Sequence, residues 1–515
     1  MRLENSVKIA RAAVIYQVVN TILGLVNRYV MIVFLGKEYL GFTGLFSNII
    51  SMLALSELGF GGAIAYNLYE PLHTNDTEKI SALVNFYKKI YRFLAAFVFT
   101  LGIILSFFLQ YLIKDLDSLS FSIDYIRLLF FLTMLETVFS YLMVYKTTLL
   151  NVGQKKYIIT NINTCASILL TIGRIAIIII TKNYVIYVSL GVVACFLRNF
   201  VASRYAVKNY PFIEDKYNKQ LRLTKEEKGG VIHNAANLSV HVLSGYAVNC
   251  TDNLIISTFV GVITLGLYSN YNLIFTAVKS LINGVVTSIQ APLGDLVVSK
   301  DKRRVREVID IASFVSFAIS SFCSVSLFVL SSSFIGLLFG PDYVLNIDVV
   351  LICAVNLFVW TMTRPIWSLS AVTGLFKEDR INALVEALSN LVISIVMVQF
   401  WGLTGTFIGT LCSYLIAFSL KTKLQFTKYF MESSFLYIKK LLLYIGVYIV
   451  EMLITYCFAR MISANVENMF LDFVINCVLC VLVPNVINYM LFNKADEYRY
   501  MRNTLEKRFL RKKLT

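Results

Sequence analysis

The sequence predicts an all-α polytopic membrane protein of about fourteen transmembrane helices, built from two parallel-repeat six-helix bundles and two additional C-terminal helices. Three observations lead to this fold class. The 515 residues are 57% hydrophobic with a mean hydropathy of +0.70, more apolar surface than a soluble fold of this size needs. Apolar runs of about 20 residues, the length that crosses a bilayer, recur along the chain. Basic residues concentrate on alternate connections between these runs.

The predicted spans follow one another with short connections on one side of the membrane and longer ones on the other. We predict them at approximately 11–35, 41–70, 89–112, 122–146, 157–181, 184–206, 233–257, 265–291, 307–335, 347–372, 380–400, 403–425, 439–460 and 469–492. The first run contains Arg28 and is too long for the apolar region of a cleavable signal peptide, so we expect it to be retained as a helix.

The positions of the basic residues predict the orientation. The termini and the even-numbered connections hold most Lys and Arg residues, whereas the odd-numbered connections hold only Lys37, Lys114, Lys182 and Arg460. By the positive-inside rule both termini are expected to be cytoplasmic. This asymmetry also accounts for the net charge of +16, so we predict no nucleic-acid partner.

Nothing in the sequence indicates a cofactor or a catalytic domain. The nine Cys residues lie singly or, for Cys477 and Cys480, within an apolar run, and only three His residues occur. Buried Cys acts as a small hydrophobic residue, so disulfides and a metal site are not expected. No nucleotide-binding motif and no soluble domain is evident, so we predict that the chain is not an enzyme and has no cofactor.

An internal repeat predicts the domain organisation. Residues 27–42 (NRYVMIVFLGKEYLGF) align without a gap to residues 252–267 (DNLIISTFVGVITLGL). Spans one and seven both start in the cytoplasm, so the repeat is parallel. The predicted parts are a six-helix bundle at 1–206, a cytoplasmic linker at 207–232, a second six-helix bundle at 233–425, two additional helices at 426–492 and a basic cytoplasmic tail at 493–515.

Polar stripes run through the apolar segments at 233–257 and 265–291. Asn249 and Asp252 lie on one stripe, and Asn272, Lys279 and Asn283 lie on the other. Steps of three and four residues place such groups on one helix face. A polar face within a bilayer must contact protein or water rather than lipid. The stripes therefore predict the wall of an aqueous path for a polar, charged cargo.

Charges inside the membrane mark the candidate site, because each costs at least about 2.5–3.5 kcal/mol at the bilayer centre. We predict that substrate is bound by Arg28, Lys279, Arg174, Asn27, Asn253 and Asn283. We predict that Glu57, Asp252 and Arg364 serve coupling or gating. Arginine and lysine in such a cavity concentrate anions, and arginine can hold a phosphate with two hydrogen bonds.

An alternative remains open for these charges: ion pairs between Arg28 and Glu57, or between Asp252 and Lys279, that only neutralise buried charge. Arg174 has no obvious partner in the sequence. Arg364 and Arg198 lie nearer the cytoplasmic ends of their spans and can extend toward the interface. Glu136 and Glu451 receive no role.

The chain resembles the polysaccharide transporters of the multidrug/oligosaccharidyl-lipid/polysaccharide (MOP) superfamily, and among them the Wzx-type flippases. The resemblance is carried by SELGFGGAI at 56–64, DNLIISTFVGVITLGLYS at 252–269 and LLFGPDY at 337–343, together with the fourteen spans and the duplication. It implies a V-shaped, MATE-like, alternating-access flippase in the bacterial cytoplasmic membrane, with proton or sodium coupling.

The resemblance further implies the cargo and the partners. Such flippases move undecaprenyl-pyrophosphate-linked oligosaccharide repeat units to the outer leaflet for capsule, exopolysaccharide or O-antigen synthesis. A polysaccharide polymerase, a chain-length regulator and membrane lipids are the implied partners. The cation-lined cavity typical of these relatives corresponds here to Arg28, Lys279 and Arg174.

Three other functions remain as alternatives. A lipid II flippase and a drug/cation antiporter belong to the same superfamily, although an antiporter of cationic drugs favours an acidic rather than a basic cavity. A membrane-embedded polymerase or glycosyltransferase is the alternative from another class. Its best motif is Asp115-Leu116-Asp117, on an external loop too short to hold a nucleotide-sugar site.

Overall fold

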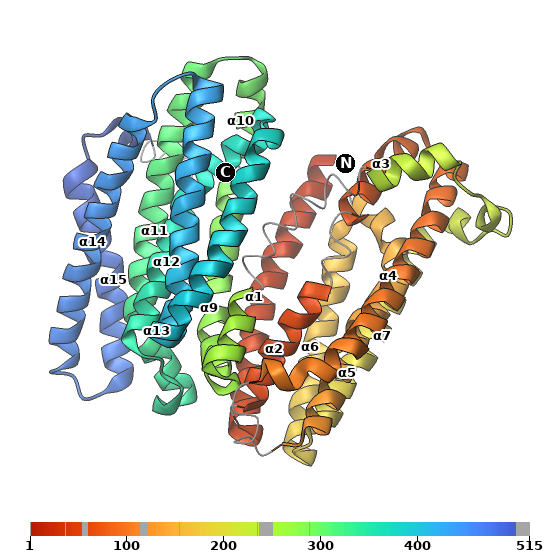
Figure 1. Cartoon of the computed structure of the whole chain (residues 1–515), viewed down its shortest axis with the longest axis horizontal. Coiled ribbons are helices and arrows are strands. Elements are labelled where there is room, and N and C mark those ends of the chain that lie inside the picture. The colour runs from red at the N-terminus through yellow and green to blue at the C-terminus, as the bar shows by residue number, and fades with distance from the viewer. Residues whose placement is uncertain are drawn as a thin grey trace. The chain divides into compact units, whose positions relative to one another are not determined.

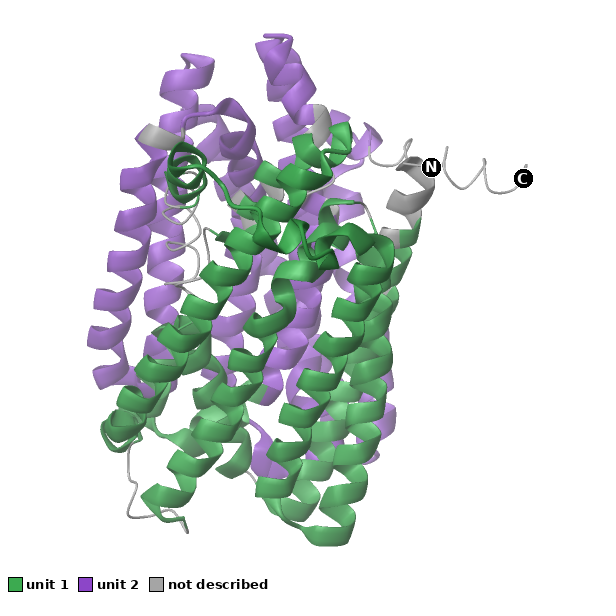
Figure 2. Cartoon of the chain, turned by 90° about the vertical axis from the view of Figure 1, so that its right-hand side faces the viewer, with its two compact units in different colours: residues 1–269 green, residues 270–515 purple. Residues whose placement is uncertain are grey.

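The computed structural model describes residues 2–36, 38–53, 60–113, 121–153, 155–233, 235, 251–287 and 289–500. Over these residues the chain forms helices and their connections, with no β-strand (Figure 1). The predicted all-α fold class is therefore confirmed. The contacts of the chain divide it into two compact units, residues 1–269 and 270–515 (Figure 2).

The helices that the structure names within unit 1 are α-helices, two short 3₁₀ helices, a π-helix and the first turns of α9. Their bounds are α1 Arg2–Leu35, α2 Glu38–Leu53, α3 Phe60–Thr74, α4 Thr77–Leu112, α5 Ile123–Val152, α6 Lys156–Thr181, α7 Tyr184–Asn209, η3 Pro211–Glu214, η4 Asn218–Gln220, η5 Ile256–Val260 and α9 Val262–Thr287.

Unit 2 contains the rest of α9 and the remaining helices. Their bounds are α10 Gln290–Val298, α11 Lys302–Phe339, η6 Pro341–Tyr343, α12 Ile347–Thr373, α13 Phe376–Leu424, η7 Gln425–Phe430, α14 Phe435–Ser463 and α15 Met469–Phe492. The predicted domain boundaries at 206, 232 and 425 stay predictions, because the division at Ser269 and Asn270 follows packing contacts and not the repeat.

The chain is a multi-pass membrane protein. Within the described residues, ten helical segments are long and apolar enough to cross a bilayer. One of them, Glu378–Phe430, contains two predicted spans, and the predicted second span covers residues of α2 and α3. The seventh predicted span falls largely outside the described residues. About fourteen crossings are consistent with these helices.

Polar caps explain where several of these helices begin. An N-terminal capping side chain accepts a hydrogen bond from a backbone N–H that has no partner within the helix. Such caps precede α4, α5, α7, α11 and α15 and are formed by Asp76, Ser122, Asn183, Asp301 and Asn468. The sequence therefore marks these helix starts locally, independently of the packing.

A sharp turn within α13 separates the eleventh and twelfth predicted spans. Trp401 and Gly402 leave helical geometry there, and Gly402 adopts φ 53° and ψ −128°. Beyond the turn, a Cβ on Gly409 would lie 2.5 Å from the backbone nitrogen of Ser394. The two arms of α13 thus pack backbone against backbone, which the small glycine permits.

The predicted cytoplasmic linker, itself part of unit 1, packs on α4 and α5. Asn85 of α4 donates hydrogen bonds to the carbonyl oxygens of Asn218 and Leu221, at 2.8 and 3.2 Å. Glu214 forms ion pairs with Lys146 of α5 and with Lys219, at 2.6 and 2.9 Å. These two cations hold the pKa of Glu214 at about 2, well below its usual value.

Candidate functional site

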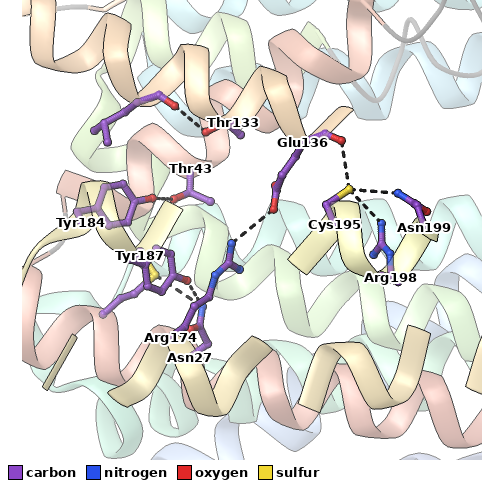
Figure 3. A network of polar contacts seen from close by, with 12 residues as sticks. Asn27, Thr43, Thr133, Glu136, Arg174, Tyr184, Tyr187, Cys195, Arg198 and Asn199 are labelled. Carbon is purple, nitrogen blue, oxygen red and sulfur yellow. Dashed lines mark hydrogen bonds and ion pairs between the residues drawn. The ribbon is translucent and has the colours of Figure 1, made fainter. Parts of the chain in front are cut away.

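In unit 1, Tyr187 of α7 contacts two predicted substrate-binding residues. The side-chain nitrogen of Asn27, on α1, donates a hydrogen bond of 2.5 Å to the Tyr187 hydroxyl (Figure 3). The guanidinium carbon of Arg174, on α6, lies 4.5 Å from the centre of the Tyr187 ring. Tyr187 is buried, and the sequence did not single it out. Through its hydroxyl and its ring, this residue of α7 contacts one residue of α1 and one of α6.

Arg174 forms an ion pair with Glu136 of α5, with Nη2 and Oε1 separated by 3.7 Å (Figure 3). The interpretation that Arg174 has no obvious partner was therefore wrong, and Glu136 gains a role. The pair fits beside α7 because residue 191 is glycine. A Cβ there would lie 2.3 Å from Arg174 Nη2 and 2.4 Å from Glu136 Oε1.

Two polar atoms at this cluster are buried without a hydrogen-bond partner among the described residues. They are Nε of Arg174 and the side-chain oxygen of Asn27. A buried polar group without a partner costs about 1–3 kcal/mol. An anion bound at Arg174 would accept from Nε, and a hydroxyl-bearing ligand would donate to Asn27, so the cluster suits an anionic, hydroxyl-rich cargo.

Arg28 follows Asn27 on α1 and lies near the same tyrosine. Its Nη1 donates a hydrogen bond of 2.7 Å to Oγ of Ser269, at the end of unit 1. The Tyr187 hydroxyl also lies within electrostatic range of the Arg28 guanidinium. Asn27, Arg28 and Arg174 therefore share Tyr187 as a neighbour, which brings three of the six predicted substrate-binding residues together.

A row of aromatic and hydroxyl groups extends from the cluster. The rings of Tyr184 and Tyr187 stack with centres 5.2 Å apart, and the hydroxyls of Thr43 and Tyr184 lie 2.7 Å apart (Figure 3). Tyr39 packs on Tyr184 with ring centres 4.4 Å apart. Such a row offers apolar faces and exchangeable hydrogen-bond groups side by side.

Unit 2 has a comparable arrangement around Trp360 of α12. Nζ of Lys279, on α9, lies 5.5 Å from the Trp360 ring centre, and the Arg364 guanidinium carbon lies 4.4 Å from it. Arg364 Nε also donates a hydrogen bond of 3.1 Å to the Trp360 carbonyl oxygen. Two cations predicted for different roles, binding and gating, thus meet at one aromatic ring.

The positions of the other predicted residues are as follows, where the structure describes them. Asn253 and Asp252 are half-buried just before η5, and Asn283 is exposed on α9. Asp252 lies in unit 1 and Lys279 in unit 2, so the ion pair between them stays a prediction. Glu57 lies outside the described residues, as does Asn249.

The sequence reasoning did not find Tyr187, Trp360 or Gly191. An aromatic residue within an apolar span more often belongs to the packed core than to a binding site. A glycine in a helix has no side-chain charge or polarity that would identify it as a site residue. The available signal for Tyr187 was its spacing from Tyr184, since residues three apart lie on one helix face.

Neither a family model nor a curated protein matches the sequence. Solved structures do match the fold. Lipid II flippase MurJ in an inward closed conformation is similar with a TM-score of 0.68 at 15% identity, covering 94% of this chain and 98% of that one. An inward-facing MATE multidrug transporter of the MOP superfamily is similar with a TM-score of 0.61 at 16% identity, covering 78% and 92%.

A MATE transporter of Vibrio cholerae is also similar, with a TM-score of 0.54 at 13% identity, covering 82% of this chain and 96% of that one. At these identities the comparisons concern the fold and not the cargo. They confirm the predicted MATE-like helical architecture, whereas the narrower resemblance to Wzx-type flippases stays a prediction. This chain therefore has the membrane-transporter fold shared by lipid II flippase MurJ and the MATE transporters.

Proposed function

We propose that this chain is a MOP-superfamily flippase that moves undecaprenyl-pyrophosphate-linked oligosaccharide units from the cytoplasmic to the outer leaflet by alternating access. The cluster around Tyr187 is the observation that carries the proposal. It places Arg28 and Arg174 near one tyrosine, pairs Arg174 with Glu136, and leaves Arg174 Nε without a hydrogen-bond partner among the described residues. Fixed positive charge with spare donors suits a pyrophosphate.

The second cluster supports the same cargo. Lys279 and Arg364 both approach Trp360, and like charges at one ring repel each other. A bound anion would interact favourably with both cations. The tyrosine row beside Arg174 adds hydroxyls and ring faces that suit an oligosaccharide better than a compact inorganic anion.

The experiment measures the display of lipid-linked sugar on the outer leaflet in cells that lack their own flippase. We expect the chain to restore display, and Arg174→Ala and Lys279→Ala to reduce it at least tenfold at equal protein levels. Arg127→Ala is the matched control, because Arg127 pairs with exposed Asp124 of the same helix and lies in neither cluster. Full display with both cluster variants would refute the proposed binding site.

A lipid II flippase is the second candidate, and the MurJ likeness favours it. The two cargoes share the polyprenyl pyrophosphate and differ in the sugars. Complementation of two strains, one depleted of its lipid II flippase and one lacking its polysaccharide flippase, separates them. Growth rescue in the first strain without surface polysaccharide in the second would replace our primary proposal with this candidate.

The remaining assignments belong to the same proposal. We place the chain in the bacterial cytoplasmic membrane with both termini inside, acting as a transporter and not as an enzyme. Glu57 and Asp252 are the proposed coupling carboxylates for a proton or sodium gradient, and Arg364 is proposed as a gating residue. A polysaccharide polymerase and a chain-length regulator are the proposed protein partners.

A further inference from the structure

Two adjoining hollows lie among α5, α6 and α7 on the other side of Glu136. The first, of about 260 Å³, is polar and is lined by Thr137, Ser140, Ser167 and Glu136 among others. The second, of about 520 Å³, is an apolar groove along α6 and α7. Ala166, Leu170, Ala194 and Arg198 line both, so the two hollows lie next to each other.

Arg198 is the cation where the hollows meet. Within the described residues its hydrogen bond is a weak one from Nη2 to Sγ of Cys195, at 3.6 Å (Figure 3). Cys195 in turn donates a hydrogen bond of 3.2 Å to the Glu136 carbonyl oxygen, so the sulfur that Arg198 contacts is itself held in place. A guanidinium carries five N–H donors, so Arg198 retains enough of them to hold a phosphate with two bonds.

The charge balance at the junction favours an anion. Among the described residues that line the polar hollow, Glu136 is the one carboxylate, and it already pairs with Arg174 at 3.7 Å. Two guanidinium groups thus accompany one carboxylate. The apolar groove on the other side of Arg198 presents Val193, Leu197 and Leu169, each more than half exposed on the surface of unit 1.

The depth of Arg198 bears on which kind of lipid it can contact. At 1.5 Å per residue, Arg198 lies roughly 16 Å from the end of α7 at Asn209 and roughly 21 Å from its start at Tyr184. The apolar core of a bilayer is about 30 Å thick, so resident phospholipids keep their phosphates near its edges. A phosphate at the depth of the Arg198 backbone would lie within the apolar core, which suits a lipid in transit, whereas an Arg198 side chain extended toward Asn209 would also reach a resident phosphate.

We propose that these hollows form a binding site for the lipid part of the cargo, with a polyprenyl chain in the apolar groove and its phosphate at Arg198. The polar hollow then accommodates the groups attached to the phosphate. The inference rests on the proposed function and adds the place where the lipid moiety binds.

The test uses the full-length protein in nanodiscs and a photoreactive polyprenyl phosphate as the probe. We expect crosslinks to α6 and α7, reduced at least fivefold by Arg198→Ala and by Val193→Trp, which fills the groove. Arg204→Ala is the matched control, since Arg204 lies on the same helix, stacks on Phe200 and lines neither hollow. Ile180→Trp controls for a bulky residue on an exposed face of α6.

Competition identifies the occupant. Unlabelled polyprenyl phosphate should displace the probe, and phosphatidylglycerol at the same concentration should not. Equal displacement by phosphatidylglycerol, or crosslinking that Arg198→Ala leaves unchanged, would overturn the inference. If the protein flips cargo in cells but gives no crosslinks at α6 and α7, the lipid site alone is overturned. If the crosslinks form but no cargo is flipped, the proposed function alone is overturned.

Discussion

Each cationic cluster is organised by one aromatic residue. Tyr187 contacts Asn27 through its hydroxyl and Arg174 through its ring, and Trp360 faces both Lys279 and Arg364. A cation over an aromatic face gains about 0.5–2 kcal/mol, more where water is excluded. The rings therefore help to hold the cations in position without placing a further negative charge beside them.

The Tyr187 hydroxyl and ring can be separated by substitution. Tyr187→Phe removes the hydrogen bond from Asn27 but keeps the ring under Arg174, so we expect the protein to lose about 0.5–1.5 kcal/mol of stability. Thermal unfolding of the purified protein in detergent measures this. Tyr111→Phe, at a 71% exposed residue, is the control and should change nothing. An equal shift for both variants would contradict the assigned hydrogen bond.

Gly191 keeps the Arg174–Glu136 pair close to α7. With Gly191→Ala the new Cβ meets the ends of two flexible side chains, which can move aside, so we expect a stability loss of less than about 1 kcal/mol. Cargo display should nevertheless fall severalfold, because the guanidinium is displaced. Gly446→Ala, with no atom within 4 Å of its Cβ, is the control. Unchanged display with Gly191→Ala would show that the position of the pair is not critical.

At the scale of elements, glycine in α13 controls how two helical arms pack. A Cβ on Gly409 would meet the backbone of Ser394, which cannot move aside as a side chain does. We therefore expect Gly409→Ala to destabilise unit 2 by about 1–3 kcal/mol, more than Gly191→Ala destabilises unit 1. Thermal unfolding of both variants compares them, and a smaller shift for Gly409→Ala would contradict the backbone contact.

Within the predicted linker at 207–232, the segment 210–223 is held to α4 and α5 partly by Glu214. Its pKa is about 2 in the folded chain and about 4.3 in an unfolded one, so its ion pairs stabilise the docked linker above pH about 4.3. That contribution is lost as the pH falls toward 2. Hydrogen exchange of residues 211–221 should therefore accelerate on acidification. Glu214→Gln should show fast exchange at neutral pH, and equal exchange in both proteins there would rule out this role.

At the scale of the whole molecule, the charge distribution predicts one orientation. Basic residues avoid the odd-numbered connections, so residues near Asn183 should be external and residues near Asn75 internal. Single cysteines at these two positions, in a variant without native cysteines, can be labelled from outside with a membrane-impermeant thiol reagent. We expect labelling at 183 only. Labelling at 75 and not at 183 would invert the predicted topology.

The sequence predicted most of the fold because the determining signals are local. Apolar runs of sufficient length gave the spans, and capping residues such as Asp76 and Asn183 mark where helices begin. The turn at Trp401 and Gly402 was also predicted as the break between two spans. The same signals predicted which charges lie inside the membrane, including Arg28, Arg174 and Lys279.

The partners of those charges could not be predicted in this way. Asn27 meets Tyr187, Glu136 meets Arg174 and Lys279 meets Trp360, and the members of each pair come from different helices. The hydropathy of a helix determines whether it crosses the membrane. It does not determine which helices it packs against, or how it is rotated about its own axis. The sequence alone thus determined that this is a many-span membrane protein with buried cations. Only the tertiary structure decided which side chains surround them, because such contacts depend on packing between distant segments.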